Sequence, residues 1–169
     1  MRYFKTLFAL GLAALGTSAM AQTATTTFNV TASVTKVCTV SATTLAFGSY
    51  DPSSGTALDQ TSTINVRCTR NTPFTVALNT GGTGGTFTNR VMRDAAPTPN
   101  TLNYNLFTTS ARTTVWGDGT GTTGTMPGVG AGMGVPNTVA LTVFGRIPDQ
   151  PTAVPSTTYS DTITVSVAY

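Results

Sequence analysis

Histidine and glutamate are absent from this chain, its acidic side chains are six aspartates, and lysine occurs only at positions 5 and 36. Serine and cysteine nucleophiles need an adjacent base, most often histidine, so few possible catalytic bases remain. Asp118 and Asp161 could in principle meet as a carboxylate pair, but aspartates are common turn formers and no spacing brings two of them together. We therefore predict that the protein is not an enzyme.

Metal, cofactor and nucleic-acid sites also lack the residues that they need. Two cysteines without histidine cannot complete an ordinary zinc site, so we expect no metal. The stretch 119–124 matches the dinucleotide pattern G-x-G-x-x-G, but no helical pattern follows it, and we expect no cofactor. The nine basic residues are scattered and the net charge is only +3, which is not typical of a nucleic-acid-binding protein.

Long apolar runs are confined to the beginning of the chain. Arg2 and Lys5 precede the apolar stretch 7–15, and Ala19-Met20-Ala21 has the small-x-small pattern of a cleavage site. This order predicts a secretory signal peptide over residues 1–21, with a retained N-terminal anchor as the alternative. After cleavage the protein would be soluble or part of an extracellular assembly.

Cys38 and Cys68 are the only cysteines. A pair of cysteines in an exported chain is oxidised more readily than it is kept as two thiols. We therefore predict one disulfide between them.

The chain downstream alternates apolar and polar residues with period two, the pattern of strands that bury one face. No segment after the signal shows a 3.6-residue period, and turn-rich pieces separate the alternating segments. This pattern predicts an all-β sandwich of one domain with few helices. The alternating residues are Ile64, Val66 and Cys68; Phe74, Val76 and Leu78; Leu102, Tyr104 and Leu106; Val139, Leu141, Val143 and Ile147; and Ile163, Val165, Val167 and Tyr169.

Residues 22–47 contain neither glycine nor proline, and this run is too long for one strand. It should hold a domain strand around Cys38 and, before it, a second strand-forming segment with no partner in its own chain. The alternative is that this segment is an ordinary first strand of the domain, which would leave residues 23–27 as the unpaired part. The apolar residues that alternate in the segment are Phe28, Val30, Ala32 and Val34.

Three further features bear on where a binding site could lie. The glycine-rich stretch 117–136 is predicted to be a long loop, either functional or mobile. Trp116, the only tryptophan, could stack on a sugar, but a tryptophan at a strand end is more often a core or rim anchor. The segment 159–169 ends the chain, so its edge has no following strand to cover it.

Six short motifs follow one another along the chain: Phe47-Gly48-Ser49-Tyr50, Val66-Arg67-Cys68-Thr69, Tyr104-Asn105-Leu106-Phe107, Trp116-Gly117-Asp118-Gly119, Val143-Phe144-Gly145-Arg146-Ile147-Pro148 and Tyr159-Ser160-Asp161-Thr162. In this order they resemble the motifs of the spore coat protein U domain, and the resemblance covers essentially the whole chain after the signal. One departure is Ser156-Thr157-Thr158 before Tyr159, where the family often has a glycine.

The resemblance implies a pilin-like subunit of the archaic, Csu-type chaperone-usher pili. Such a subunit is an incomplete immunoglobulin-like β-sandwich that lacks its last strand. By this resemblance, residues 22–34 are a donor-strand extension with Phe28, Val30, Ala32 and Val34 as plugs, and residues 35–169 are the domain. The acceptor groove and chaperone edge would be formed by Ile163, Val165, Val167 and Tyr169.

The implied partners are a periplasmic chaperone, an outer-membrane usher, and other copies of this chain or related pilus subunits. The implied location is the periplasm during assembly and then a cell-surface pilus with a role in adhesion and biofilm formation. A tip adhesin or minor pilus component and a spore or cyst coat protein remain as alternatives. A tip adhesin of this type is expected to have two domains, so the size of the chain favours the stalk role.

Overall fold

The computed structural model describes residues 20–169, which form two antiparallel β-sheets and no α-helix. This confirms the all-β prediction. No helix in the described part of the chain is long and apolar enough to cross a membrane. The elements are β1 (Cys38–Ala42), β2 (Leu58–Cys68), β3 (Pro73–Leu78), β4 (Arg90–Arg93), β5 (Thr101–Phe107), β6 (Met126–Val129), the 3-10 turn η1 (Val135–Asn137), β7 (Val139–Ile147) and β8 (Val165–Ala168).

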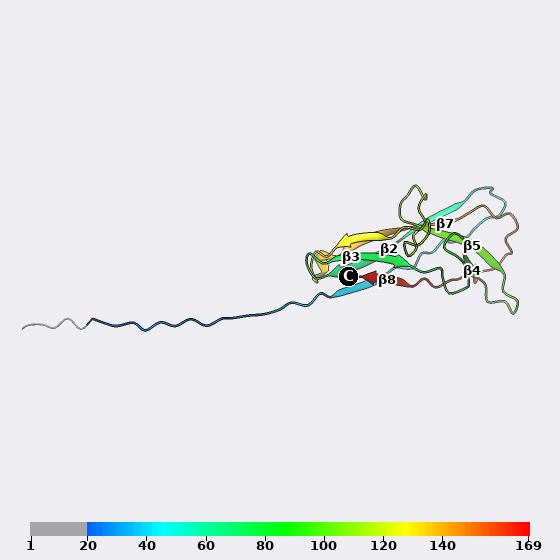
Figure 1. Ribbon diagram of the computed structural model, residues 1–169. Helices are drawn as coiled ribbons and strands as arrows, with labels where there is room; N and C mark the ends of the chain where they lie inside the picture. Colours follow the sequence, from blue (N-terminus) through cyan, green and yellow to red (C-terminus); the bar gives the residue numbers. More distant parts are fainter. Residues whose placement is uncertain (1–19) are drawn as a thin grey trace, which may run out of the picture. The chain divides into compact units, whose positions relative to one another are not determined.

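The larger sheet has the strand order β1-β2-β7-β5-β4, and the smaller sheet has the order β6-β3-β8. The two sheets form the two layers of a sandwich (Figure 1). The core lies between them, because the alternating apolar residues of each strand point inward as their period of two predicts. The buried hydrophobic residues are Ile64, Val66, Cys68, Phe74, Val76, Leu78, Leu102, Tyr104, Leu106, Trp116, Leu141, Val143 and Ile147.

The last strand is shorter than the alternation suggests. β8 pairs with β3 only from Val165, opposite Leu78, because β3 ends there. Beyond that point Asn79 continues the contact: its N–H donates to the carbonyl of Thr164 at 3.2 Å, and its side-chain oxygen accepts from the N–H of Thr164 at 2.9 Å. Residues 159–164 therefore run as an extended continuation of β8 without belonging to the strand.

The interpretation of 117–136 as one long loop is wrong, because this stretch contains β6, which pairs with β3. A strand with proline and glycine is tolerated there because β6 is an edge strand. Gly128 also lets the ring of Phe74 lie directly against the β6 backbone. Trp116 is fully buried and donates a 3.0 Å hydrogen bond to the carbonyl of Val76, so it is a core anchor and not an exposed sugar-stacking residue.

The chain divides into two compact units, residues 1–33 and 34–169. In the first unit the described residues carry no strand or helix, and the Phe28 and Val30 side chains are 85% and 84% exposed. The predicted signal peptide, residues 1–21, lies almost wholly outside the described residues and stays a prediction.

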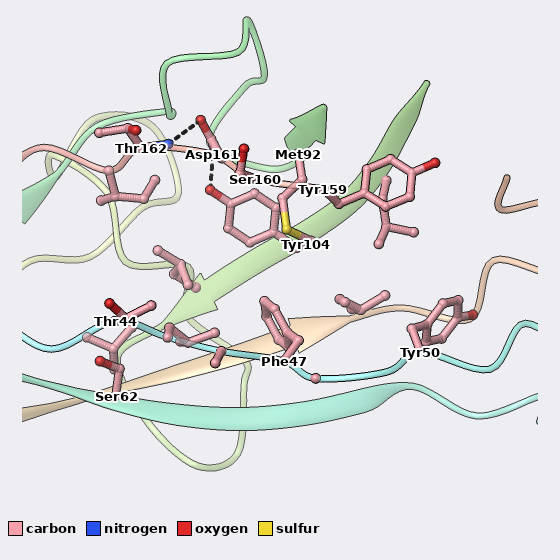
Figure 2. Close-up of a pocket in the computed structure, with 18 of the residues that line it drawn as sticks. Thr44, Phe47, Tyr50, Ser62, Met92, Tyr104, Tyr159, Ser160, Asp161 and Thr162 are labelled. Atoms are coloured by element: carbon pink, nitrogen blue, oxygen red, sulfur yellow. Dashed lines mark hydrogen bonds between the residues drawn. The ribbon is translucent and has the colours of Figure 1, made fainter. Parts of the chain in front are cut away.

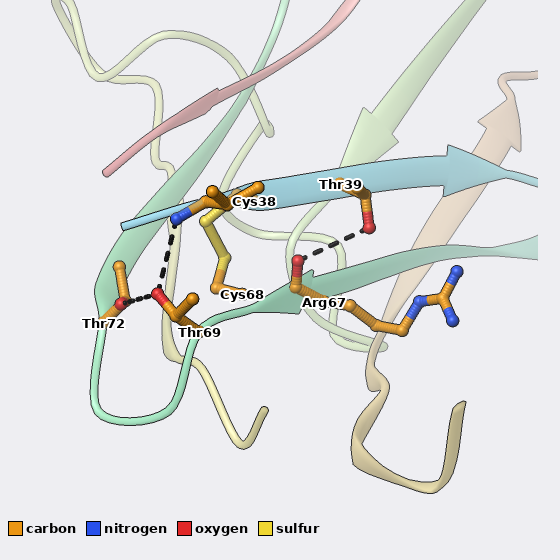
Figure 3. The surroundings of a disulfide bond; sticks show 7 residues. Cys38, Thr39, Arg67, Cys68, Thr69 and Thr72 are labelled. Carbon is orange, nitrogen blue, oxygen red and sulfur yellow. Dashed lines mark hydrogen bonds between the residues drawn. A yellow bond between two sulfur atoms is a disulfide. The ribbon is translucent and has the colours of Figure 1, made fainter. Parts of the chain in front are cut away.

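The structure contains the predicted disulfide, which joins Cys38 at the start of β1 to Cys68 at the end of β2. The two cysteines face each other in the antiparallel register of these strands, with Cα atoms 4.1 Å apart. Beside the disulfide, the N–H of Thr69 donates to the carbonyl of Val37 at 2.9 Å (Figure 3 shows the surroundings). The disulfide and this hydrogen bond fix the point at which the chain enters the sandwich.

Candidate functional site

A cavity of about 920 Å³ opens within the sandwich, between two chain segments that belong to neither sheet along most of their length. One wall is residues 42–50, which start at the last residue of β1, and the other is residues 159–165, which end at the first residue of β8 (Figure 2). We call this cavity the groove and these segments the β1-side wall and the β8-side wall. Its floor includes Ser62, Ile64, Leu78, Met92, Leu102, Tyr104, Leu106, Val143 and Ile147.

The β1-side wall leaves the larger sheet after Thr43. The N–H of Thr43 still donates to the carbonyl of Thr63 at 3.0 Å, whereas the structure describes no hydrogen bond to the main chain of residues 44–50. Two apolar side chains hold this segment in place. Leu45 and Phe47 lie against Gly145 of β7, where an added Cβ would come within 2.8 Å and 2.9 Å of their side-chain atoms. Gly145 therefore allows the wall to pack closely while its main chain stays unpaired.

The β8-side wall also has an unpaired edge. Residues of an antiparallel strand point their N–H and C=O groups alternately to one side and the other. Both groups of Thr164 face Asn79, and both groups of Ser160 face Arg93. Asp161 and Ile163, which alternate with them, therefore point their main-chain groups to the opposite side, and within the described residues β8 has no partner strand there.

One hydrogen bond crosses from the floor of the groove to the β8-side wall. The hydroxyl of Tyr104, on β5, donates to the carboxylate of Asp161 at 2.6 Å (Figure 2). The same carboxylate accepts from the N–H groups of Gly82 at 2.8 Å and Thr162 at 2.7 Å. Burial raises the pKa of the Tyr104 hydroxyl well above its usual range, and its hydrogen bond to Asp161 raises it further. The hydroxyl is therefore a permanent donor at neutral pH.

A buried arginine supports the loop behind Asp161. The Arg90 side chain is fully buried and donates to the carbonyls of Asn79 and Trp116, both at 2.7 Å, and to the side-chain oxygen of Asn105 at 2.8 Å. These bonds satisfy a charge that would otherwise be costly to bury. Burial lowers the pKa of Arg90, and the nearby Tyr104 and Asp161 oppose this shift.

At the disulfide end, part of the inner face of β1 is uncovered. Val40 lies on the same face of its strand as Cys38, because residues two apart point the same way. Its partner in the register is Val66, which is fully buried, yet the Val40 side chain is 42% exposed. An apolar residue that faces the inside of a sandwich while it remains exposed indicates that a covering element is absent from that position.

The predicted wall residues occupy different environments. Ile163 and Val165 line the groove, and Val167 is half-buried against the core. Tyr169 follows β8 and is 58% exposed. The predicted plug residues Phe28, Val30, Ala32 and Val34 are all exposed.

Sequence reasoning missed the roles of the β1-side wall, of Tyr104 with Asp161, and of Arg90. Asp161 did carry a signal, because it falls in phase with the inward-facing Ile163 and Val165, where an apolar residue would be expected. Arg90 had none, because nothing in its neighbourhood of the sequence indicates a buried cation.

The groove has the two features that strand addition requires, which are unpaired main-chain groups on both walls and an apolar floor. The described residues contain no group of three or more histidine, cysteine, aspartate or glutamate side chains that could hold a metal ion. Asp118 lies in a turn, where it accepts hydrogen bonds from the N–H and hydroxyl of Thr120.

Comparisons with known proteins agree with this geometry. The model of the Spore Coat Protein U domain family matches residues 24–166 of the chain. A similar solved structure is the crystal structure of the CsuC-CsuE chaperone-tip adhesion subunit pre-assembly complex from archaic chaperone-usher Csu pili of Acinetobacter baumannii, with 26% identity and a TM-score of 0.53. The match covers 80% of this chain but only 40% of that chain. No match was found among curated proteins.

Proposed function

Because the chain belongs to the Spore Coat Protein U domain family, we propose that it is a structural subunit of an archaic chaperone-usher pilus that polymerises by donor-strand exchange. In this proposal, residues 28–34 of one copy occupy the groove of the next copy. The added strand would complete the smaller sheet beyond β8. Such pili are associated with adhesion and biofilm formation, and we assign this chain the same role.

The single observation that carries the proposal is the groove with its two unpaired walls. An apolar cavity alone could hold many ligands. Here residues 44–50, whose main chain makes no hydrogen bond among those described, border the same space as the unpaired edge of the β8-side wall. Only another extended backbone supplies the complementary row of donors and acceptors on both sides.

The described residues before β1 supply a segment of suitable chemistry. Phe28, Val30 and Val34 are apolar, alternate with polar residues, and are 85%, 84% and 89% exposed. Exposed residues of this size gain about 1.5 to 3 kcal/mol each on full burial. Period-two geometry would direct all of them to the floor of the groove at once.

The proposal implies several partners and an assembly route. A bare strand edge invites uncontrolled pairing, so a periplasmic chaperone would cover the groove until assembly. The similar Acinetobacter subunit was crystallised with such a chaperone. An outer-membrane usher would then exchange the chaperone for the extension of another copy or of a related subunit. The protein would thus pass through the periplasm and end in a pilus on the cell surface.

Two alternative roles share the same groove. One is a tip adhesin or minor pilus component, which is favoured by the similarity to a tip adhesion subunit of Acinetobacter. The other is a spore or cyst coat protein, which is favoured by the family description. Electron microscopy of surface appendages labelled with an antibody to this chain distinguishes the three roles: labelling along the shaft, at the tip only, or on a coat.

The proposal is tested with the purified chain in the absence of any chaperone. It should associate into polymers, and a synthetic peptide of residues 22–37 added in excess should occupy the groove and keep the chains monomeric. The matched control is the same peptide with Phe28→Asp and Val30→Asp, which should not block association. A chain that stays a well-folded monomer with a cooperative thermal transition, without any peptide, contradicts the proposal.

A further inference from the structure

The groove is not uniform along its length, because a chain of contacts crosses it at one position. Phe47 comes from the β1-side wall, and its ring centroid lies 6.2 Å from that of Tyr104 in an edge-to-face arrangement. The Tyr104 hydroxyl in turn bonds to Asp161 on the β8-side wall at 2.6 Å. Figure 2 shows the Phe47 and Tyr104 rings between the two walls, with Asp161 beyond. We call these three residues the crossing.

The crossing is held firmly from both sides. The Phe47 side chain rests against Gly145, and the Asp161 carboxylate is fixed by the N–H groups of Gly82 and Thr162. Tyr104 is only 5% exposed. A strand that lies over the crossing therefore has little depth for a side chain at that position, and moving a packed ring aside would cost stability.

The donor segment contains one residue that suits such a shallow position. Among the four alternating residues 28, 30, 32 and 34, only Ala32 has a side chain of a single carbon. We propose that Ala32 of the incoming copy lies over the crossing, opposite Asp161. This alignment of the donor strand with the β8-side wall, which we call the register, rests on the proposed function. It makes that function more specific, because the crossing decides which residue of the donor can enter at this position.

The same placement determines the direction of the donor strand. On the β8-side wall, the inward-facing residues beyond Asp161 are Ile163, Val165 and Val167 toward the disulfide end, but only Tyr159 in the other direction before the extended segment begins. The donor segment has two larger residues before Ala32 and one after it. The two larger donor residues before Ala32 lie on the side with three inward-facing wall residues only if the donor runs antiparallel to β8.

In the antiparallel register, each apolar residue of the donor has a position on the wall. Val34 lies opposite Tyr159, Val30 opposite Ile163 and Phe28 opposite Val165. The large Phe28 ring then reaches the disulfide end of the groove, where the inner face of β1 is uncovered at Val40. In a parallel strand Val30 would lie opposite Tyr159, and Phe28 would extend past the extended segment.

The size requirement is tested in the full-length chain with Ala32→Leu. Both Ala32 and Ala24 are exposed and lie outside strands, so neither change should disturb the fold of the domain. Ala32→Leu should slow polymer growth by about tenfold or more, because the larger side chain meets the crossing. Ala24→Leu is the matched control: it makes the same substitution before residues 28–34, outside the groove, and should assemble at the wild-type rate. Equal assembly rates for the two variants overturn the assignment of Ala32 to the crossing.

The direction is tested with cysteine pairs in full-length chains, read as covalent ladders on a non-reducing gel. Val30→Cys combined with Ile163→Cys should cross-link neighbouring copies, whereas Val30→Cys combined with Tyr159→Cys should not. Ladders from the second pair alone would show a parallel strand and overturn the register. The register is separable from the proposed function itself: if Phe28→Asp with Val30→Asp abolishes polymers while Ala32→Leu does not, strand exchange stands and only the register fails.

Discussion

The hydroxyl of Tyr104 on β5 donates a 2.6 Å hydrogen bond to the carboxylate of Asp161, and this bond joins the larger sheet to the segment that leads into β8. It is a link between the two layers that does not depend on apolar packing. It lies at the side of the sandwich where the walls of the groove are unpaired. The Tyr104 hydroxyl thus helps to position the β8-side wall, together with the hydrogen bonds of Ser160 to Arg93 and of Thr164 to Asn79.

Replacing Tyr104 by phenylalanine should reveal this bond through its pH dependence. Hydrogen bonds to charged groups contribute about 1.5 to 3 kcal/mol, so Tyr104→Phe should lower the melting temperature of the assembled protein at neutral pH. The folded-state pKa of Tyr104 is raised, mainly by burial and then by Asp161. A raised pKa means that the contribution is fully present below the ordinary tyrosine pKa of about 10 and is lost as the pH rises beyond it.

The measurement is the difference in melting temperature between wild type and Tyr104→Phe from neutral pH to about pH 11.5, across the ordinary tyrosine pKa. This difference should narrow above pH 10. Tyr169→Phe is the control, because the Tyr169 side chain is 58% exposed and makes no hydrogen bond among those described. A difference that stays constant with pH contradicts the role given to the hydroxyl.

Gly145→Ala should damage the groove more than the core. The new methyl group would meet Leu45 and Phe47 at 2.8 Å and 2.9 Å, so these side chains must move away from β7. The domain should stay folded, with a cost of about 1 to 3 kcal/mol, while polymer growth falls severalfold. Gly134→Ala is the matched control, since the nearest atom to its added Cβ would be 3.5 Å away. Equal assembly by the two variants would show that the β1-side wall does not shape the groove.

We expect Cys38 and Cys68 to be joined by the disulfide in the exported protein. Intact-mass analysis of the exported protein should show two masked thiols that become alkylated only after reduction. Replacing both cysteines by serine should lower the free energy of unfolding by about 3.6 kcal/mol on the chain-entropy estimate for a loop of 30 residues. Two cysteines that are alkylated without reduction, in protein taken from the periplasm, would rule out the disulfide.

The sequence was sufficient for the sheets but not for the site. Period-two alternation predicted β2, β3, β5 and β7, because in each of these strands one face is buried and hydrophobicity alone reports it. β6 was missed because Pro127 and Gly128 lie in it, and an edge strand accepts both.

The groove itself depends on contacts between residues far apart in the sequence. Phe47 and Tyr104 are neighbours only because residues 44–50 cross over β7 at Gly145, and Tyr104 meets Asp161 only across the sandwich. No local pattern encodes such a meeting. What the sequence did indicate is the pair of segments involved: an alternating apolar segment before β1 and an alternating segment, residues 159–169, with an uncovered edge.

The central claim is that residues 28–34 act in a neighbouring copy and not in their own domain, and polymer formation by the variant Phe28→Asp with Val30→Asp tests it most directly. Both side chains are exposed, so the domain should fold normally. In the groove of a neighbour, however, two unpartnered charges would cost several kcal/mol, and polymers should not form. Asn29→Ser should assemble as wild type does, because alternation directs residue 29 away from the floor. Normal polymers from the double aspartate variant, or loss of its folded monomer, would contradict the account.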